Sequence, residues 1–211
     1  MPYTVEYRIS SVQSLRNGTA LTHQSTEVKA MDSEGRRMIA SSPAEWPGDK
    51  VPTTLVSVTD PAARTNYLWR SPGKQVTLTT TDTLLASGRN CAKIAKTTST
   101  PDWIQHEKLE TEDLGTATIQ GIEAHGQRIS TTVPAGAFGN TAPFVSVSET
   151  WTAVDPALKD LLVHQKTVDP RIGSVTTEVV SFRRGEPDRA TFQPPEGYEV
   201  VETTASDFAC K

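Results

Sequence analysis

The sequence contains little of what several protein classes require. Its 211 residues include only two cysteines, and no stretch approaches the ~18 consecutive apolar residues that a membrane-spanning helix needs. A helical membrane protein and a disulfide-rich domain are therefore excluded. The chain also lacks basic runs, and its net charge is −4. Clustered Lys and Arg supply most of the affinity for nucleic acids, so this composition argues against a nucleic-acid-binding protein.

Large apolar side chains are scarce as well. Hydrophobic residues make up 36% of the chain and aromatic residues 6%, while charged residues make up 22%. This charge content is too low, and the net charge too small, for a disordered protein, so we expect a globular fold with a lean core. Internal repeats, heptads and low-complexity linkers are absent, which favours a single domain over residues 1–211.

Thr, Ser and Val are used in place of large apolar residues, and they favour strands over helices. Tyr3, Val5, Tyr7 and Ile9 alternate with polar residues, which predicts a strand with one apolar face. Asn17-Gly18 then predicts a two-residue type I′ hairpin turn. A second strand over about 19–30, a turn at 32–35 and a third strand near 36–41 complete a three-stranded meander.

Further strand-like segments follow, with turn residues between them at the spacing typical of sandwiches, barrels and open antiparallel sheets. Asp155 before Pro156 and the segment 186–192 each predict a single helical turn. Residues 82–110 fit neither pattern and are expected to form an irregular excursion, and residues 202–211 a C-terminal tail. The expected strands lie at 53–59, 65–70, 75–81, 116–120, 122–133, 145–153, 161–169 and 174–184.

The closing segment resembles a known group of proteins. Phe182-Arg183-Arg184-Gly185-Glu186-Pro187-Asp188, followed by Phe192, Pro195 and Gly197-Tyr198, is similar to the end of lipoprotein-carrier-like proteins of the LolA, LolB and RseB type. Leu15-Arg16-Asn17-Gly18-Thr19, Asp32-Ser33-Glu34-Gly35-Arg36-Arg37 and the stretch 114–124 resemble exported proteins of soil bacteria in the same group. These stretches are turn and strand patterns rather than catalytic motifs.

The resemblance implies a mainly β fold, in which a strongly curved antiparallel sheet forms an open or half barrel. A few short helices or loops would cross its apolar concave face. In the carrier families that face takes up acyl chains, and in sensor-like relatives it recognises proteins. The partner implied here is accordingly a hydrophobic ligand or an envelope protein. A structural or interaction protein that self-associates or binds a partner through its sheet edges is the alternative.

Aromatic residues are the main candidates for lining a ligand pocket. Trp69 and Trp151 lie on expected strands and form the preferred pair, with Tyr67 and Phe182 beside them, while Trp46 lies in a Pro-rich loop and could act as a rim. The competing interpretation makes these rings ordinary core, because aromatic side chains dominate the buried area of a lean core.

Catalytic and metal-binding patterns are not found. Ser71-Pro72-Gly73-Lys74 places a lysine in a solvated turn, which is unsuited to a buried base. His23, His106, His125 and His164 show no metal-ligand spacing. Glu107, Glu110, Glu112 and Asp113 are interpreted as one solvated acidic stretch. We therefore expect neither an enzyme nor a bound cofactor or metal.

The compartment is inferred from the start of the chain and from the resemblance. Met1-Pro2-Tyr3 leads directly into a strand, as in a mature exported domain whose leader has been removed, and the similar families are exported. We expect a periplasmic or extracellular protein, with a cytoplasmic one as the alternative. Export would allow a disulfide between Cys91 and Cys210, which would close a loop of more than half the chain and tie down the C-terminal tail.

Overall fold

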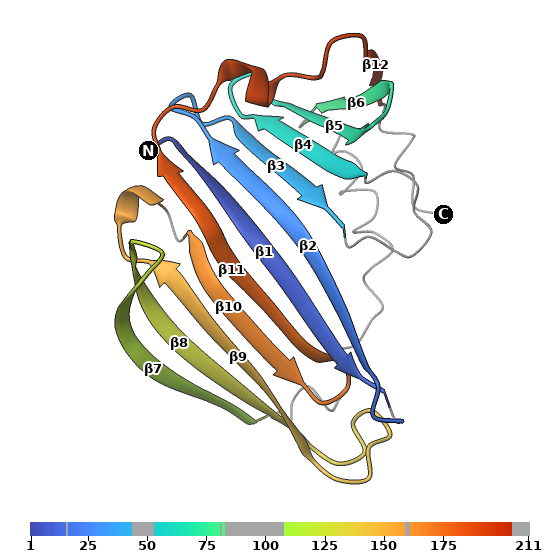
Figure 1. The fold of residues 1–211 in the computed structure, drawn as a ribbon, viewed down its shortest axis with the longest axis vertical. Coiled ribbons are helices and arrows are strands. Elements are labelled where there is room, and N and C mark those ends of the chain that lie inside the picture. Colours follow the sequence, from blue (N-terminus) through green and yellow to red (C-terminus); the bar gives the residue numbers. More distant parts are fainter. Residues whose placement is uncertain (16, 44–52, 81, 83–107, 159–160, 204–211) are drawn as a thin grey trace. The chain divides into compact units, whose positions relative to one another are not determined.

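The computed structural model describes residues 1–15, 17–43, 53–80, 82, 108–158 and 161–203. The elements within these ranges are twelve β-strands and two single-turn 3-10 helices (Figure 1). The mainly β fold predicted from the sequence is thereby confirmed. The strands are β1 (Tyr3–Ser14), β2 (Ala20–Met31), β3 (Arg37–Ser42), β4 (Thr54–Asp60), β5 (Thr65–Ser71), β6 (Gln75–Thr80), β7 (Lys108–Ile119), β8 (Ile122–Val133), β9 (Phe144–Ala153), β10 (Leu162–Asp169), β11 (Gly173–Arg184) and β12 (Glu199–Glu202), and the helical turns are η3 (Pro156–Leu158) and η4 (Arg189–Phe192).

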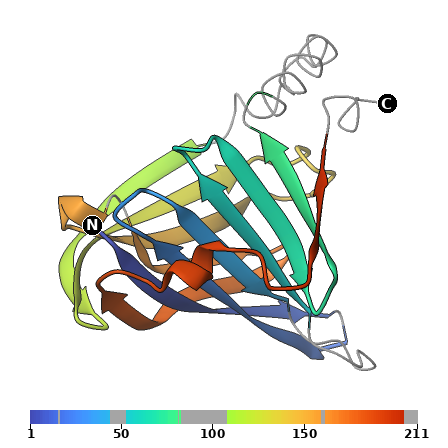
Figure 2. The same cartoon turned by 90° about the horizontal axis from the view of Figure 1, so that it is seen from above.

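The strands form one sheet in the order β12-β6-β5-β4-β3-β2-β1-β11-β10-β9-β8-β7. Chain neighbours such as β4 and β5 or β10 and β11 pair in antiparallel fashion. The last strand, β12, instead runs parallel to β6, because the chain passes through η4 after β11 before it reaches that edge (Figures 1 and 2). This parallel pairing was not predicted, since it joins segments more than a hundred residues apart.

The alternating pattern of β1 predicts its buried face correctly. Val5 and Tyr7 are almost fully buried, whereas Arg8 between Tyr7 and the next apolar position is exposed. The predicted hairpin of 161–169 with 174–184 is confirmed as β10 and β11. Both predicted helical turns are confirmed as η3 and η4. The Asp155 carboxylate accepts the backbone N–H of Ala157 at 2.9 Å, as expected of a cap.

The turn between β1 and β2 differs from the prediction. Leu15 and Thr19 are joined by a backbone hydrogen bond of 2.8 Å, and Gly18 N donates to Leu15 O, so the loop has three residues rather than two. Gly18 has a φ of +82°, whereas Asn17 has no positive φ. Gly18 alone therefore adopts the left-handed conformation, whereas the predicted type I′ turn needs a positive φ at both Asn17 and Gly18.

Two predicted boundaries also change. The sheet resumes at Lys108, so residues 108–110 belong to β7 rather than to the irregular excursion. At the other end, Glu202 belongs to β12 and not to the tail. Residues 83–107 and 204–211, and with them Cys91 and Cys210, lie outside the described residues, so the predicted disulfide stays a prediction. The strong curvature and the single-domain organisation stay predictions as well.

The chain divides into two compact units, each assembled from separate segments. The first contains Met1–Glu6, Thr26–Ser99 and Phe182–Lys211, and the second contains Tyr7–Ser25 and Thr100–Ser181. In the first unit, buried residues of β2 to β6 pack with Phe192 of η4, which returns from the C-terminal segment. The described members of this core cluster are Ala30, Met38, Val58, Trp69, Val76 and Phe192.

The second unit has its own buried residues, contributed by β1, β8, β10, β11 and the segment around η3. The hydroxyl of Tyr7 donates to the backbone carbonyl of Leu162 at 2.8 Å, so the one polar atom of this buried side chain is satisfied. Leu158 of η3 is 1% exposed, which shows that the short helical turn contributes directly to packing. Among the described residues of this unit, Ala124, Val163 and Val179 are fully buried as well.

Candidate functional site

The predicted ligand-lining aromatics occupy different environments. Trp69 belongs to the core cluster of the first unit, and Tyr67 packs against that cluster, so the structure brings these two together. Phe182 lies near Tyr3, with 6.3 Å between the ring centroids. Trp151 belongs to the second unit. Trp46 lies outside the described residues.

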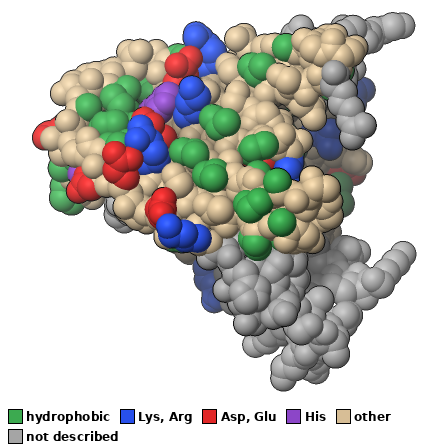
Figure 3. Space-filling model, turned by 90° about the horizontal axis from the view of Figure 1, so that it is seen from below, with side chains coloured by type: hydrophobic (Ala, Val, Ile, Leu, Met, Phe, Trp, Pro, Cys, Tyr) green, Lys and Arg blue, Asp and Glu red, His purple; other side chains and the backbone are tan. Residues whose placement is uncertain are grey.

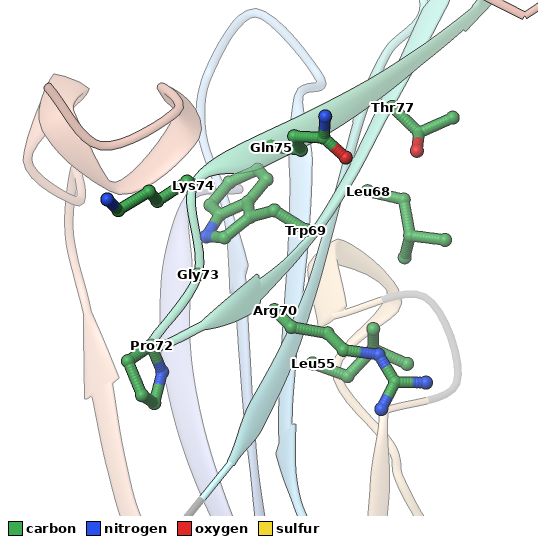
Figure 4. A pocket seen from close by; sticks show the side chains of 9 residues that line it. All are labelled: Leu55, Leu68, Trp69, Arg70, Pro72, Gly73, Lys74, Gln75 and Thr77. Carbon is green, nitrogen blue, oxygen red and sulfur yellow. The ribbon is translucent and has the colours of Figure 1, made fainter. Parts of the chain in front are cut away.

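A pocket of about 460 Å³ surrounds the end of the β5–β6 hairpin in the first unit (Figure 4). This volume falls within the usual range for small-molecule sites. Trp69 is the member of the predicted set that lines it. The full lining consists of Leu55, Leu68, Trp69, Arg70, Pro72, Gly73, Lys74, Gln75 and Thr77.

Strand register explains which lining residues share a face. Leu55 of β4 is the direct partner of Arg70 on β5, and Leu68 of β5 is the partner of Thr77 on β6. Since side chains alternate along a strand, Leu68 and Arg70 point to the same face. Trp69 points to the opposite face, where its partner Val76 is also part of the core.

Leu55 and Leu68 are the apolar side chains that sequence reasoning missed. They are 39% and 42% exposed, although both are large hydrophobic residues within strands, Leu55 near the start of β4 and Leu68 in the middle of β5. An exposed apolar side chain is informative when it lines a cavity rather than standing alone. The sequence signal was Leu68 beside Trp69, because adjacent strand residues cannot both face the same core.

The turn that closes the pocket depends on Gly73 and Tyr198. A Cβ at Gly73 would collide with the backbone carbonyl oxygen of Arg70, so this position accepts only glycine without rearrangement. The Gly73 N–H donates to the Tyr198 hydroxyl at 3.0 Å, and that hydroxyl lies 3.4 Å from the Arg70 carbonyl oxygen. Tyr198 therefore holds the β5–β6 turn from the segment between η4 and β12.

Two cations line the pocket, and they point in different directions. In Figure 4 the Arg70 side chain extends toward Leu55 and Leu68, whereas Lys74 extends to the other side of the hairpin. Within the described part of the chain, the Arg70 guanidinium has no hydrogen-bond or ion-pair partner. The described lining includes no carboxylate. The Leu55–Leu68 side of the pocket thus combines apolar surface with one uncompensated positive charge.

Trp151 is held by a polar network on the second unit. Its indole N–H donates to the Glu149 carboxylate at 3.0 Å, and Arg128 joins Glu149 and Glu112. The hydrogen bond from Trp151, followed by the ion pair with Arg128, holds the pKa of Glu149 below its usual value. Figure 3 shows acidic, basic and histidine side chains next to one another on one face of the molecule.

The acidic stretch has the properties expected of a solvated strand. A hydrogen bond from Lys108 lowers the pKa of Glu110, and the backbone N–H of Gly115 together with His125 lowers that of Asp113. A general acid needs a raised pKa, so these exposed carboxylates are in the wrong state for that role. Glu107 and His106 lie outside the described residues.

Histidine and carboxylate side chains are among the groups that a metal site would use. Among the described ranges, no three His, Cys, Asp or Glu side chains are grouped as a metal site would require. His125 pairs with Asp113 at 2.9 Å on the exposed β7–β8 hairpin. No described helix has the length and apolar character needed to cross a membrane.

Comparisons with known proteins give matches of structure only. No family model and no curated protein sequence matches the chain. Lipoprotein LppX of Mycobacterium tuberculosis matches at 12% identity and a TM-score of 0.31, covering 87% of this chain and 88% of that one. A LolA superfamily protein from Nitrosomonas europaea matches at 8% identity and a TM-score of 0.33, covering 92% and 90%.

A putative outer membrane lipoprotein-sorting protein domain from Vibrio parahaemolyticus matches at 10% identity and a TM-score of 0.33. The match covers 90% of this chain and 88% of that one. The chain is thus similar in structure to LolA-like and lipoprotein-sorting proteins at low sequence identity and high coverage.

Proposed function

We propose that this protein is a non-catalytic binding protein of the cell envelope that takes up an apolar ligand at the β5–β6 pocket. The ligand class is a lipid, an acyl chain or the lipid-modified part of a peptide. The observation that carries the proposal is the exposure of Leu55 and Leu68 in a pocket of ligand size. This chain has few large apolar side chains. Exposing two leucines therefore gives up stabilising free energy that their burial would contribute to the fold.

The pocket has the composition of a binding site rather than of a reaction centre. Its described lining consists of apolar side chains, two cations, an amide and a hydroxyl. A catalytic site would bring a nucleophile, a base and an orienting group within hydrogen-bond reach of one another. Lys74 and Arg70 extend in different directions, so they cannot act together on one reacting atom. Binding is therefore the activity that this geometry supports.

Location in the periplasm or outside the cell is part of the same proposal. Its support is the sequence resemblance of the closing segment, from Phe182 to Tyr198, to exported carrier-like proteins. A ligand of this chemistry is also consistent with that location, because apolar molecules need a carrier to cross an aqueous compartment. A cytoplasmic location remains the alternative.

Association through sheet edges is the less favoured function. The edge strand β7 carries exposed Lys108, Glu110 and Glu112, and its register shifts between Asp113 and Gly115. Charged side chains and bulges on an outer strand hinder pairing with another sheet. The other edge strand, β12, has only four residues and carries a glutamate at each end. Both edges therefore have features that protect against strand addition.

The test is a titration of the purified protein with 1-decanol, followed by NMR of the leucine methyl groups. We expect the Leu55 and Leu68 methyl signals to shift in a saturable manner, because these side chains contact the alkyl chain. Leu68→Ser should weaken binding by about fivefold, as expected for losing roughly half of the ~1.5–3 kcal/mol that burial of one leucine contributes.

Ile39→Ser is the matched control. Ile39 is 40% exposed, like Leu68, and lies on β3 outside the pocket. This variant should bind decanol as the parent protein does. Equal losses in both variants, or methyl shifts spread over the whole molecule, would contradict a specific site. If size-exclusion chromatography showed an oligomer that dissociates into monomers when β7 is disrupted, the edge-association function would replace the proposed one.

A further inference from the structure

The apolar side of the β5–β6 pocket contains one charged group. Arg70 is the direct cross-strand partner of Leu55 and lies two residues from Leu68 on the same face of β5. Figure 4 shows its guanidinium beside Leu55, with Leu68 above. Other arginines on the sheet surface pair with a carboxylate of a neighbouring strand. Arg8, for example, forms an ion pair with Glu178 at 3.2 Å. Arg70 has none within the described residues.

We propose that this pocket binds a single-chain anionic amphiphile, a fatty-acid carboxylate, with the carboxylate on Arg70 and the alkyl chain over Leu55 and Leu68. This inference rests on the proposed function and specifies its ligand. The planar guanidinium offers two parallel N–H donors that match the two oxygens of a carboxylate. The adjacent leucines supply the apolar surface that the chain needs, so both ends of the ligand have a complementary partner.

The volume of the pocket fits a ligand with one alkyl chain. At about 460 Å³ it lies in the lower half of the volume range of small-molecule sites, which suits a ligand with a single alkyl chain. A peptide partner is also disfavoured, because an extended peptide binds by adding to a free strand edge. The pocket instead lies over β4, β5 and β6, and each of these strands has paired neighbours on both sides.

The experiment compares three probes with the same alkyl chain: decanoate, 1-decanol and decyltrimethylammonium, each used below its micelle concentration. Affinities are measured by calorimetry and by the shifts of the Leu55 and Leu68 methyl signals. We expect decanoate to bind about fivefold more tightly than decanol, and the cation to bind most weakly. The preference for decanoate should decrease as salt is added, because an exposed ion pair is screened.

Arg70→Gln should lower the affinity for decanoate about fivefold and leave that for decanol unchanged. Arg70→Lys keeps the charge but not the paired donors, so it should fall between the parent protein and Arg70→Gln. Arg37→Gln is the matched control, since Arg37 is an exposed arginine on β3 outside the pocket. This control should bind decanoate as the parent does, and the amide NMR spectrum of each variant verifies its fold.

The outcomes separate the two proposals. Decanol binding as tightly as decanoate, or Arg37→Gln weakening decanoate as much as Arg70→Gln does, would overturn the role of Arg70 and leave the apolar site in place. A failure of all three probes to shift the Leu55 and Leu68 methyl signals would overturn both proposals. A selective loss of decanoate binding in Arg70→Gln supports both.

Discussion

Gly126 and Trp151 are direct cross-strand partners on β8 and β9, and a Cβ added at Gly126 would lie 2.7 Å from Cε2 of the indole. Gly126 has an ordinary negative φ, so the backbone does not require glycine at this position. Glycine is needed because it leaves space for the indole ring. The position of Trp151 therefore depends on the absence of a side chain on the neighbouring strand.

We predict that Gly126→Ala destabilises the protein by about 1–3 kcal/mol, the usual cost of inserting a methyl group into a filled space. Urea unfolding followed by circular dichroism measures the change. The same substitution in a Trp151→Ala background should cost little, because the ring that it would meet is gone. An equal cost in both backgrounds would show that the close approach is not what limits this position.

The β1–β2 turn predicts unequal roles for Asn17 and Gly18. Gly18→Ala should cost about 1 kcal/mol, because a Cβ is strained at a φ of +82° although nothing lies within 4 Å of it. Asn17→Ala should cost less, about 0.5 kcal/mol, since it removes only the exposed hydrogen bond of 3.0 Å from Thr19 N to Asn17 Oδ1. Thermal unfolding of the two variants checks the order. The reverse order would indicate the type I′ turn instead.

Asp169 makes the stability of the second unit dependent on pH. Its carboxylate accepts hydrogen bonds from Nε, Nη2 and the backbone N–H of Arg171, and these lower its pKa from 3.8 to about 2. A lowered pKa in the folded state stabilises the protein above pH ~4, and this contribution is lost as the pH falls from about 4 to 2.

The corresponding variant is Asp169→Asn. Near pH 7 it should be less stable than the parent by roughly 1–2 kcal/mol, a range that allows for solvent screening at the partly exposed Arg171. The difference between the two proteins should shrink as the pH is lowered toward 2. Urea unfolding at several pH values measures it. A difference that stays constant with pH would mean that the ionised form of Asp169 contributes nothing.

Tyr198 should stabilise the β5–β6 turn through its hydroxyl. Tyr198→Phe removes the acceptor of the Gly73 N–H and should cost about 0.5–1.5 kcal/mol, the net value of one hydrogen bond. Hydrogen exchange of the Gly73 amide should become faster, while the amides of β10 serve as an internal control because they lie in the other unit. An unchanged exchange rate of the Gly73 amide would show that the β5–β6 turn is stable without the Tyr198 hydroxyl.

The predicted pairing of Cys91 with Cys210 is tested by thiol titration of the denatured, non-reduced protein. Protein isolated from an oxidising compartment should show no reactive thiol, and reduction should lower its thermal midpoint, because the bridge constrains the unfolded chain. Two reactive thiols per chain would contradict both the bridge and the expectation of export that motivates it.

Local chemistry in the sequence determined most of the strands. Alternation of apolar and polar residues placed β1 and its buried Val5 and Tyr7 correctly, since a strand repeats every two residues. Turn residues placed the β10–β11 hairpin for a similar reason: Gly173, with a φ of +92°, adopts a conformation that few other residues tolerate. The resemblance in the closing segment came from the same kind of local pattern.

Only the tertiary structure decided where the pocket lies. Trp69 and Leu68 are equally apolar neighbours, and which of them is buried depends on the face that Phe192 covers after returning from the C-terminal segment. The placement of Arg70 beside Leu55 depends on the β4–β5 register, and the clamp of Tyr198 on Gly73 joins residues 125 positions apart. Contacts between distant segments leave no periodic trace along the chain, so they appear only when the whole sheet is assembled.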